Sequence, residues 1–264
     1  MLPSLKDRIV LITGASSGIG AACAHVLGAS GAKLILNGRR KDRLTELAET
    51  LGRKYSANCL VLRFDVRELN SVKVELENLP RDWQAIDVLV NNAGLARGLD
   101  KLAEGKIDDW EEMIDTNIKG LLYVTRFVIP GMIQRDRGHV VNVASTAGIY
   151  NYPCGNVYSA TKAAVRVLSE SLRMDLLGTR VHVSTISPGL VETEFSQVRY
   201  HGDKERAAKV YRGLTPLKPE DVADVIHFCL TRPEHVNVSE VLITPTDQVT
   251  STLVHRREQV TGTK

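Results

Sequence analysis

The 264-residue chain has little cysteine, and its cysteines stand far apart. They are Cys23, Cys59, Cys154 and Cys229, and no two of them form a C-x-x-C pair. This spacing argues against a disulfide framework and against a zinc site, and it is typical of small buried thiols in a reducing compartment. We therefore expect a cytoplasmic protein that holds no metal.

Long apolar runs and charge of one sign are also lacking. No apolar stretch reaches membrane-spanning length, and residues 1–8 lack the apolar core of a secretory signal. The 34 lysines and arginines exceed the 31 aspartates and glutamates by only three, without a basic block. This composition does not indicate nucleic-acid binding or attachment to a membrane, so we expect a small-molecule substrate.

Strand-like and helical patterns alternate through most of the chain. Apolar strand-like runs lie at 8–13, 33–37, 59–63, 86–91, 139–144, 181–186 and 240–244. Helical patterns lie at 18–29, 41–52, 68–78, 108–135, 157–177 and 219–230. This alternation predicts the α/β class, as a single-domain Rossmann-type, doubly wound parallel sheet with helices on both faces.

One domain over residues 1–264 is expected, with two segments outside the regular alternation. Residues 190–215 are polar and predict a substrate loop or lid with short helices. Residues 246–264 are polar and predict a tail or a partner contact. Pro130 is expected to kink the long helix at 108–135.

A glycine turn follows the first predicted strand. Gly14, Gly18 and Gly20 form G-x-x-x-G-x-G between that strand and a helix. Glycines let the backbone approach a pyrophosphate closely, and a helix N-terminus offers free N–H donors. Ser16 and Ser17 could bind a phosphate or cap the helix. The alternative for the whole motif is a purely structural turn.

The second predicted strand is followed by arginines and no acidic residue. NAD sites usually carry a carboxylate here for the ribose diol, whereas NADP sites use arginine for the 2′-phosphate. Arg39 and Arg40 match a phosphate dianion bidentately, so they favour NADP. The alternative is a pair of solvated arginines at a helix start.

Residues after the third and fourth strands also suit a flat ligand. Asp65 could accept a hydrogen bond from an adenine amino group, or it could cap the helix near residue 68. The small residues in 91–94 let the backbone approach a ligand, or they form a plain turn.

Tyr158 and Lys162 lie four residues apart in a strongly periodic helical segment, thirteen residues after Ser145. They would share one helix face, where an ammonium lowers the pKa of a phenol toward working pH. A tyrosine with such a pKa can exchange a proton with a substrate oxygen. A second pair with the same spacing, Tyr200 and Lys204, is interrupted by glycine and aspartate, so no helix is expected to align it.

Together these residues resemble the short-chain dehydrogenase/reductase family. The family's signatures occur in its order over roughly residues 5–245, at 13–20, Asp65, 91–94, Asn117, Ser145, Tyr158, Lys162 and 187–189. Within the family, the segments 91–98, 114–120, 155–158, 194–199 and 232–237 are most similar to NADP-dependent 3-hydroxy acid dehydrogenases. Such enzymes oxidise serine, 3-hydroxyisobutyrate or 3-hydroxypropionate and reduce malonic semialdehyde.

The resemblance implies a role for each matching residue. Tyr158 would be the acid/base, Lys162 would tune its pKa, Ser145 would hold the substrate oxygen, and Asn117 would support a water relay. The cofactor residues implied are Gly14, Ser16, Ser17, Gly18, Ile19, Gly20, Arg39, Arg40, Asp65, Val66, Asn92, Ala93, Gly94, Tyr158, Lys162, Pro188, Gly189, Val191 and Thr193. Thr193 could instead cap the next short helix. A homotetramer is usual in this family, built through the helices at 108–135 and 157–177.

A hydroxy-acid substrate also needs a partner for its carboxylate. Arg199 is our hypothesis, because guanidinium binds carboxylate bidentately, and Arg97 is the second candidate. His201 in the predicted lid could touch substrate. Each of these side chains could equally be a plain surface residue. Two further functions stay open: a ketone or sugar reductase, and a cofactor-binding protein without turnover.

Overall fold

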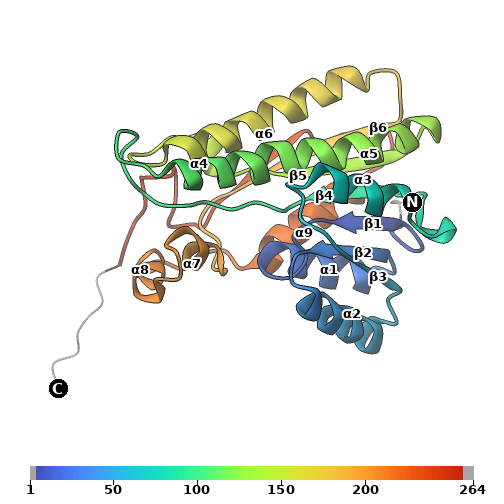
Figure 1. The fold of residues 1–264 in the computed structure, drawn as a ribbon, viewed down its shortest axis with the longest axis horizontal. Coiled ribbons are helices and arrows are strands. Elements are labelled where there is room, and N and C mark those ends of the chain that lie inside the picture. The colour runs from blue at the N-terminus through green and yellow to red at the C-terminus, as the bar shows by residue number, and fades with distance from the viewer. Residues whose placement is uncertain (1–3, 258–264) are drawn as a thin grey trace.

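The computed structural model describes residues 4–257 and contains a seven-stranded, wholly parallel sheet (Figure 1). The order across the sheet is β3-β2-β1-β4-β5-β6-β7. The strands are β1 Ile9–Ile12, β2 Lys33–Gly38, β3 Cys59–Arg63, β4 Val88–Asn91, β5 Gly138–Val143, β6 Val181–Pro188 and β7 Glu240–Ile243. All seven fall on predicted strand-like runs, so the predicted strand content is confirmed.

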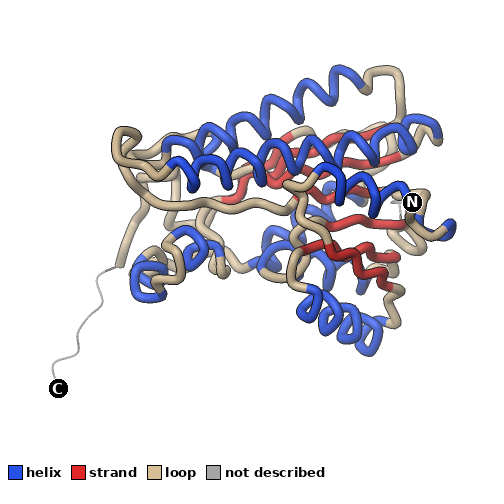
Figure 2. The backbone as a smooth tube through the Cα atoms, viewed as in Figure 1, coloured by secondary structure: helices blue, strands red, loops and turns tan. Residues whose placement is uncertain are grey.

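Helices cover both faces of the sheet, which confirms the doubly wound fold class. One face carries α1 Gly18–Ala29, α2 Lys41–Tyr55 and α9 Pro219–Leu230. The other carries α3 Leu69–Glu77, α5 Leu121–Gln134 and α6 Asn156–Asp175. In Figures 1 and 2 the sheet lies between these two layers.

The composition of the strands explains why both faces are covered. Val10 and Ile12 of β1 pack into the core on the α1 side, whereas Ile9 and Leu11 pack on the α5 side. All four are at most 6% exposed. Successive side chains of a strand point to opposite faces, so a continuous apolar run requires a helix layer on each.

The strand order places the ligand end of the sheet. The chain runs from β1 outward to β3 and then returns to form β4 on the other side of β1, where Ile12 pairs with Val90. In open α/β sheets, ligands bind beyond the carboxyl ends of the strands at this reversal. The glycine turn after β1 therefore meets the segment after β4.

The helix predicted at 108–135 is interrupted. It consists of α4 Ile107–Ile114, a π-helical turn over Asp115–Gly120, and α5. Asn117 lies in this π turn, where the wider spacing re-aims side chains, and such turns are frequent at functional sites. Pro130 lies inside α5, which continues to Gln134.

The predicted lid contains two short helices, α7 Phe195–Arg199 and α8 Lys204–Lys209. The described part of the polar tail packs against this segment, since Arg257 donates its backbone N–H to the Gly213 carbonyl at 2.7 Å. The remaining tail residues, 258–264, lie outside the described residues. In the described part of the chain, no helix is long and apolar enough to span a membrane.

Candidate active site

A pocket of about 350 Å³ opens at the carboxyl ends of the strands. Most of the residues predicted to bind cofactor or substrate line it: Gly14, Ser16, Ser17, Gly18, Ile19, Arg39, Arg40, Asp65, Val66, Asn92, Ala93, Gly94, Ser145, Tyr158, Lys162, Pro188, Gly189, Val191 and Thr193. Gly20, Asn117 and Arg199 are outside this lining. The lid adds Glu194, Phe195 and Val198, which the sequence analysis did not select as pocket residues.

The glycine turn fits tightly against the segment after β4. Gly14 has a φ of +66°, and a Cβ there would lie 3.0 Å from the Ala93 Cα. A Cβ on Gly20 would lie 2.4 Å from the Gly14 carbonyl oxygen. Asn92 fastens this contact by donating its side-chain amide to the Thr13 carbonyl at 2.9 Å. Glycine is thus required for the approach of the backbone as well as for its conformation.

Ser16 and Ser17 contact an arginine and do not cap helix α1. The N-cap residue Ser17 makes no capping hydrogen bond. Instead, Arg40 donates to the Ser16 hydroxyl at 3.1 Å and to the Ser17 hydroxyl at 2.8 Å. Arg40 and Arg43 also contact Glu194, at 2.9 and 2.6 Å. Arg43 is one helical turn after Arg40, a spacing that could have revealed it, whereas Glu194 is 154 residues from Arg40.

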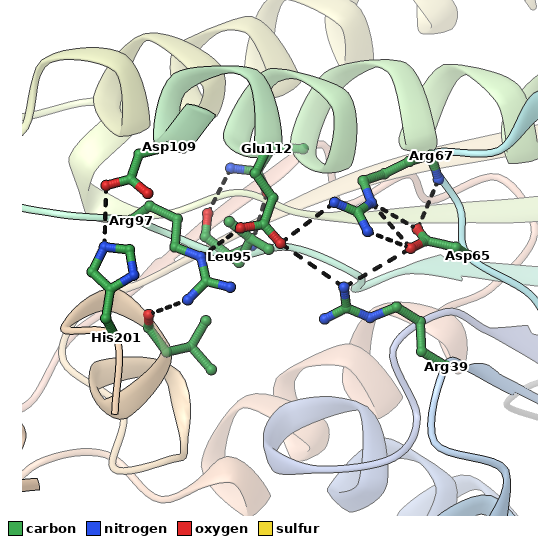
Figure 3. A network of polar contacts seen from close by, with 10 residues as sticks. Arg39, Asp65, Arg67, Leu95, Arg97, Asp109, Glu112 and His201 are labelled. Atoms are coloured by element: carbon green, nitrogen blue, oxygen red, sulfur yellow. Dashed lines mark hydrogen bonds and ion pairs between the residues drawn. The ribbon is translucent and has the colours of Figure 1, made fainter. Parts of the chain in front are cut away.

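Arg39 and Asp65 belong to a network of charged side chains (Figure 3). The Arg39 guanidinium lies 3.9 Å from both Asp65 and Glu112. Both carboxylate oxygens of Asp65 accept from Arg67, the shortest contact being 2.7 Å. Burial acts to raise the pKa of Asp65, but Arg67 outweighs it and holds that pKa below its usual value. The predicted adenine contact of Asp65 would therefore be shared with Arg67, which sequence reasoning missed.

Arg97, the second candidate to bind the substrate carboxylate, already has acceptors within the protein. Its Nε donates to Glu112, and its Nη1 donates to the Val198 carbonyl at 2.7 Å (Figure 3). His201 likewise faces Asp109, with Nε2 3.1 Å from the carboxylate. Both contacts connect the lid to helix α4 or to the segment after β4. They support the structural alternative for Arg97 and His201.

The serine, tyrosine and lysine come together from two elements. Ser145 follows β5 and begins a short 3-10 helix, Thr146–Gly148. Tyr158 and Lys162 lie one turn apart in α6, and both are buried. A Cβ on Gly148 would lie 2.6 Å from the Lys162 backbone, so this glycine lets the turn after Ser145 pack directly on α6. Tyr200 follows the end of α7 and Lys204 begins α8, so no helix aligns the two, as predicted for that pair.

Burial dominates the acid–base properties of the pair in α6. It raises the pKa of Tyr158 to about 12, opposed first by the Arg199 cation and then by the Ser145 hydroxyl. It lowers the pKa of Lys162 to about 8. This differs from the predicted lowering of the Tyr158 pKa by Lys162. The Lys162 ammonium donates to the Val143 carbonyl at 2.9 Å, and the cation that acts on the phenol is Arg199.

Arg199 lies among aromatic rings beside the tyrosine. Its guanidinium carbon is 4.8 Å from the centre of the Tyr158 ring and 5.2 Å from that of Phe195. One terminal nitrogen donates to the Tyr152 hydroxyl at 2.8 Å. The Nε atom is buried and finds no acceptor among residues 4–257. A buried donor without a partner is energetically costly, and a carboxylate would satisfy it.

Asn117 fixes the backbone next to this site. Its side chain accepts from the Leu95 N–H at 2.9 Å and donates to the Leu95 carbonyl at 2.8 Å and to Thr161 at 3.0 Å. A Cβ on Gly94 would lie 3.2 Å from both the Asn117 oxygen and the Lys162 nitrogen. The side chain is buried and positions this segment, and the predicted water relay stays a prediction.

Thr193 shows the capping contact that the sequence left open. Its hydroxyl accepts from the Phe195 N–H at 3.1 Å, at the start of α7. Its methyl group faces Gly18, where a Cβ would be 3.2 Å away. Gly189 is similarly close to Gln248 of the tail, whose side chain accepts from the Leu190 N–H at 2.8 Å.

The sequence matches the profile of one known protein family. The sequence profile described as short chain dehydrogenase matches residues 8–204. The chain belongs to the short-chain dehydrogenase family. The predicted membership of the short-chain dehydrogenase/reductase family is confirmed, and the roles of the individual site residues stay predictions.

Relatives within the short-chain dehydrogenase family narrow the resemblance. NADP-dependent 3-hydroxy acid dehydrogenase of Salmonella typhi is 49% identical over 94% of this chain and 99% of its own length. The Schizosaccharomyces pombe enzyme of that name is 44% identical over 96% of this chain and 98% of its own length. The closed form of a serine dehydrogenase complexed with NADP+ has a TM-score of 0.90 and 46% identity, covering 95% of this chain and all of that one. The predicted similarity to 3-hydroxy acid dehydrogenases is confirmed.

Proposed function

We propose that this chain is an NADP-dependent dehydrogenase of small 3-hydroxy acids, of the serine, 3-hydroxyisobutyrate and 3-hydroxypropionate type. The observation that carries the proposal is the position of Arg199. A fixed cation with an unpartnered buried Nε lies beside the tyrosine that would exchange the substrate proton. The similarity to enzymes named for this activity supports the same conclusion.

The residues present fit NADP. The glycine turn offers a backbone surface on which a Cβ would collide, and Arg39 and Arg40 stand at the pocket edge for a 2′-phosphate. The residues that would hold the cofactor are those predicted from the sequence, with Asp65 shared with Arg67. When bound, NADP supplies the acceptor for the hydride that leaves the hydroxyl-bearing carbon.

The chain's own residues supply orientation and proton transfer. Ser145 would hold the substrate oxygen while the Tyr158 phenolate takes the proton of the substrate hydroxyl. Arg199 would bind the carboxylate and favour that ionised form. Lys162, with its pKa lowered to about 8 by burial, could pass protons toward solvent near working pH.

The test follows nicotinamide absorbance with NADP and, separately, with NAD. The substrates are L-serine, D-serine, 3-hydroxypropionate, 3-hydroxyisobutyrate and a neutral secondary alcohol. NADP-dependent turnover confined to the acids is expected. Turnover of the neutral alcohol alone would favour a ketone or sugar reductase, and cofactor binding without any turnover would favour a binding protein.

We also propose that the protein is a cytoplasmic homotetramer with a single domain. Apolar side chains on the outer surface of α6 and beyond its end support assembly, since Val167, Met174 and Leu177 are 61%, 66% and 88% exposed. Cys23, Cys59, Cys154 and Cys229 are free thiols, which suits a reducing compartment. Size-exclusion chromatography with light scattering measures the mass of the assembly in solution, and a monomer mass would refute the tetramer.

A further inference from the structure

A carboxylate of the lid, Glu194, contacts two arginines at the edge of the pocket, Arg40 and Arg43. Glu194 stands directly before α7, and its two oxygens contact different arginines, Arg40 at 2.9 Å and Arg43 at 2.6 Å. Glu194 and Arg40 both line the pocket, with Ser16 and Ser17. An anion from the protein itself therefore lies in the region proposed to receive a phosphate.

Most of the N–H donors of Arg40 already have acceptors. Its Nε and Nη2 donate to the hydroxyls of Ser16 and Ser17, and its Nη1 donates to Glu194. Within residues 4–257, Glu194 is the one carboxylate in ion-pair contact with Arg40. A guanidinium has five N–H donors, so one on Nη1 remains, next to the Glu194 carboxylate. A phosphate that binds Arg40 in a bidentate manner must therefore replace one of these acceptors.

Charge decides which acceptor would leave. The two serine hydroxyls are neutral and can turn to donate to a phosphate, whereas the Glu194 carboxylate repels it. Arg43 and then Arg40 hold the pKa of Glu194 below its usual value, so the carboxylate is ionised at neutral pH. Arg43 remains as a partner for Glu194 after Arg40 is lost.

We propose that Glu194 is a specificity-determining residue that competes with the 2′-phosphate of the cofactor for Arg40. The inference rests on the proposed binding of NADP. In the free protein, the contact between Glu194 and Arg40 holds the start of α7 against the start of α2. Binding of the 2′-phosphate displaces Glu194 from Arg40 and so frees the lid on that side. A cofactor without this phosphate leaves the contact in place.

The size of the effect follows from exposure. The side chains of Glu194 and Arg40 are 39% and 42% exposed, so solvent and salt weaken their interaction. Removal of the Glu194 charge should tighten binding of a 2′-phosphorylated ligand by about three- to tenfold. A ligand without the phosphate should gain less than about twofold, because it does not compete for Arg40.

The test measures binding of 2′,5′-ADP and of 5′-AMP to the full chain by calorimetry at low salt. Three proteins are compared: wild type, Glu194→Gln and Glu192→Gln. Glu192 is the matched control, because it is exposed, lies two residues earlier, makes no ion pair in the described chain and is outside the pocket lining. Only Glu194→Gln should bind 2′,5′-ADP more tightly, and none should differ for 5′-AMP.

Other outcomes overturn the inference. Unchanged or weaker binding of 2′,5′-ADP to Glu194→Gln would show that Glu194 does not compete. An equal gain in Glu192→Gln would attribute the effect to net charge alone. A wild-type protein that binds 5′-AMP as tightly as 2′,5′-ADP would instead refute the proposed cofactor, and this is read from the wild type before any variant is compared. In the Arg40→Ala background, Glu194→Gln should lose most of its effect.

Discussion

At the scale of single residues, the chemistry of the site depends on which charges share a buried space. Tyr158 is 9% exposed, and this burial penalises the phenolate. The cation that opposes the penalty is Arg199 of α7, 41 residues after Tyr158, and not Lys162 one turn away. Arg199 would thus serve both the substrate and the tyrosine.

The substrate role of Arg199 predicts a selective loss of affinity. Arg199→Ala should raise KM for 3-hydroxy acids about 10- to 100-fold, since a charged hydrogen bond contributes about 1.5–3 kcal/mol. KM for a neutral secondary alcohol should change little. Steady-state kinetics on both substrates measures the difference. Equal increases for acid and alcohol would assign Arg199 to the architecture of the lid alone.

The electrostatic role of Arg199 predicts a shift of the pH profile. Without this cation the pKa of Tyr158 rises further, so less phenolate is present at a given pH and oxidation slows. The limb of the kcat profile for oxidation that rises with pH should therefore move to higher pH in Arg199→Leu, by on the order of one pH unit. Arg199→Lys, which retains the charge, should stay close to wild type. An unmoved limb in the leucine variant would contradict this role.

At the scale of elements, close approach of backbones builds the pocket. The turn after β1 touches the segment after β4, and the 3-10 turn after β5 touches α6. The π turn in the long helix brings Asn117 against Leu95. In each case a small residue or an amide makes the contact, because a larger apolar side chain would separate the two elements.

Two glycines of different surroundings test this view. Gly20→Ala places a Cβ 2.4 Å from a backbone oxygen that cannot move aside, so it should cost about 1–3 kcal/mol and abolish most NADP binding. Gly52→Ala in α2 meets only a carbonyl oxygen at 3.9 Å and should stabilise by about 0.5–1 kcal/mol. Thermal unfolding and cofactor titration measure both. Normal cofactor binding by Gly20→Ala would contradict the argument.

At the scale of the whole molecule, the end of the sheet opposite the pocket carries a half-buried histidine, His139. His139 of β5 donates to or accepts from Ser184 at 2.8 Å, and its ring lies 5.3 Å from that of His182. Burial, and then His182, lower the pKa of His139 to about 3. His139 lies near the start of β5, whereas the pocket opens at the carboxyl ends of the strands.

The pKa of His139 predicts a loss of stability in acid. Below about pH 6.5 the unfolded chain binds a proton there that the folded chain does not take up until about pH 3. Stability is therefore lost as pH falls through this window, by about 1.4 kcal/mol per unit, or about 2 kcal/mol at pH 5. Denaturant unfolding of His139→Gln should show a shallower dependence between pH 5 and 7. The exposed control His235→Gln should keep the wild-type slope.

The sequence by itself determined the order of strands and helices, because apolar periodicity and glycine turns act over a few residues. It also placed Tyr158 and Lys162 one turn apart on a single helix, because their four-residue spacing is local. The π turn at Asn117 was not predictable from periodicity, since packing against Leu95 stabilises it.

Only the tertiary structure decided what these residues contact. Arg40 contacts Glu194 across 154 residues, and Arg97 contacts the Val198 carbonyl across 101 residues. The direction of the Tyr158 pKa shift was decided by burial, which depends on how the lid and α6 pack together. Such contacts join segments that are distant along the chain, and their charge effects depend on solvent exclusion, which no local pattern of residues records.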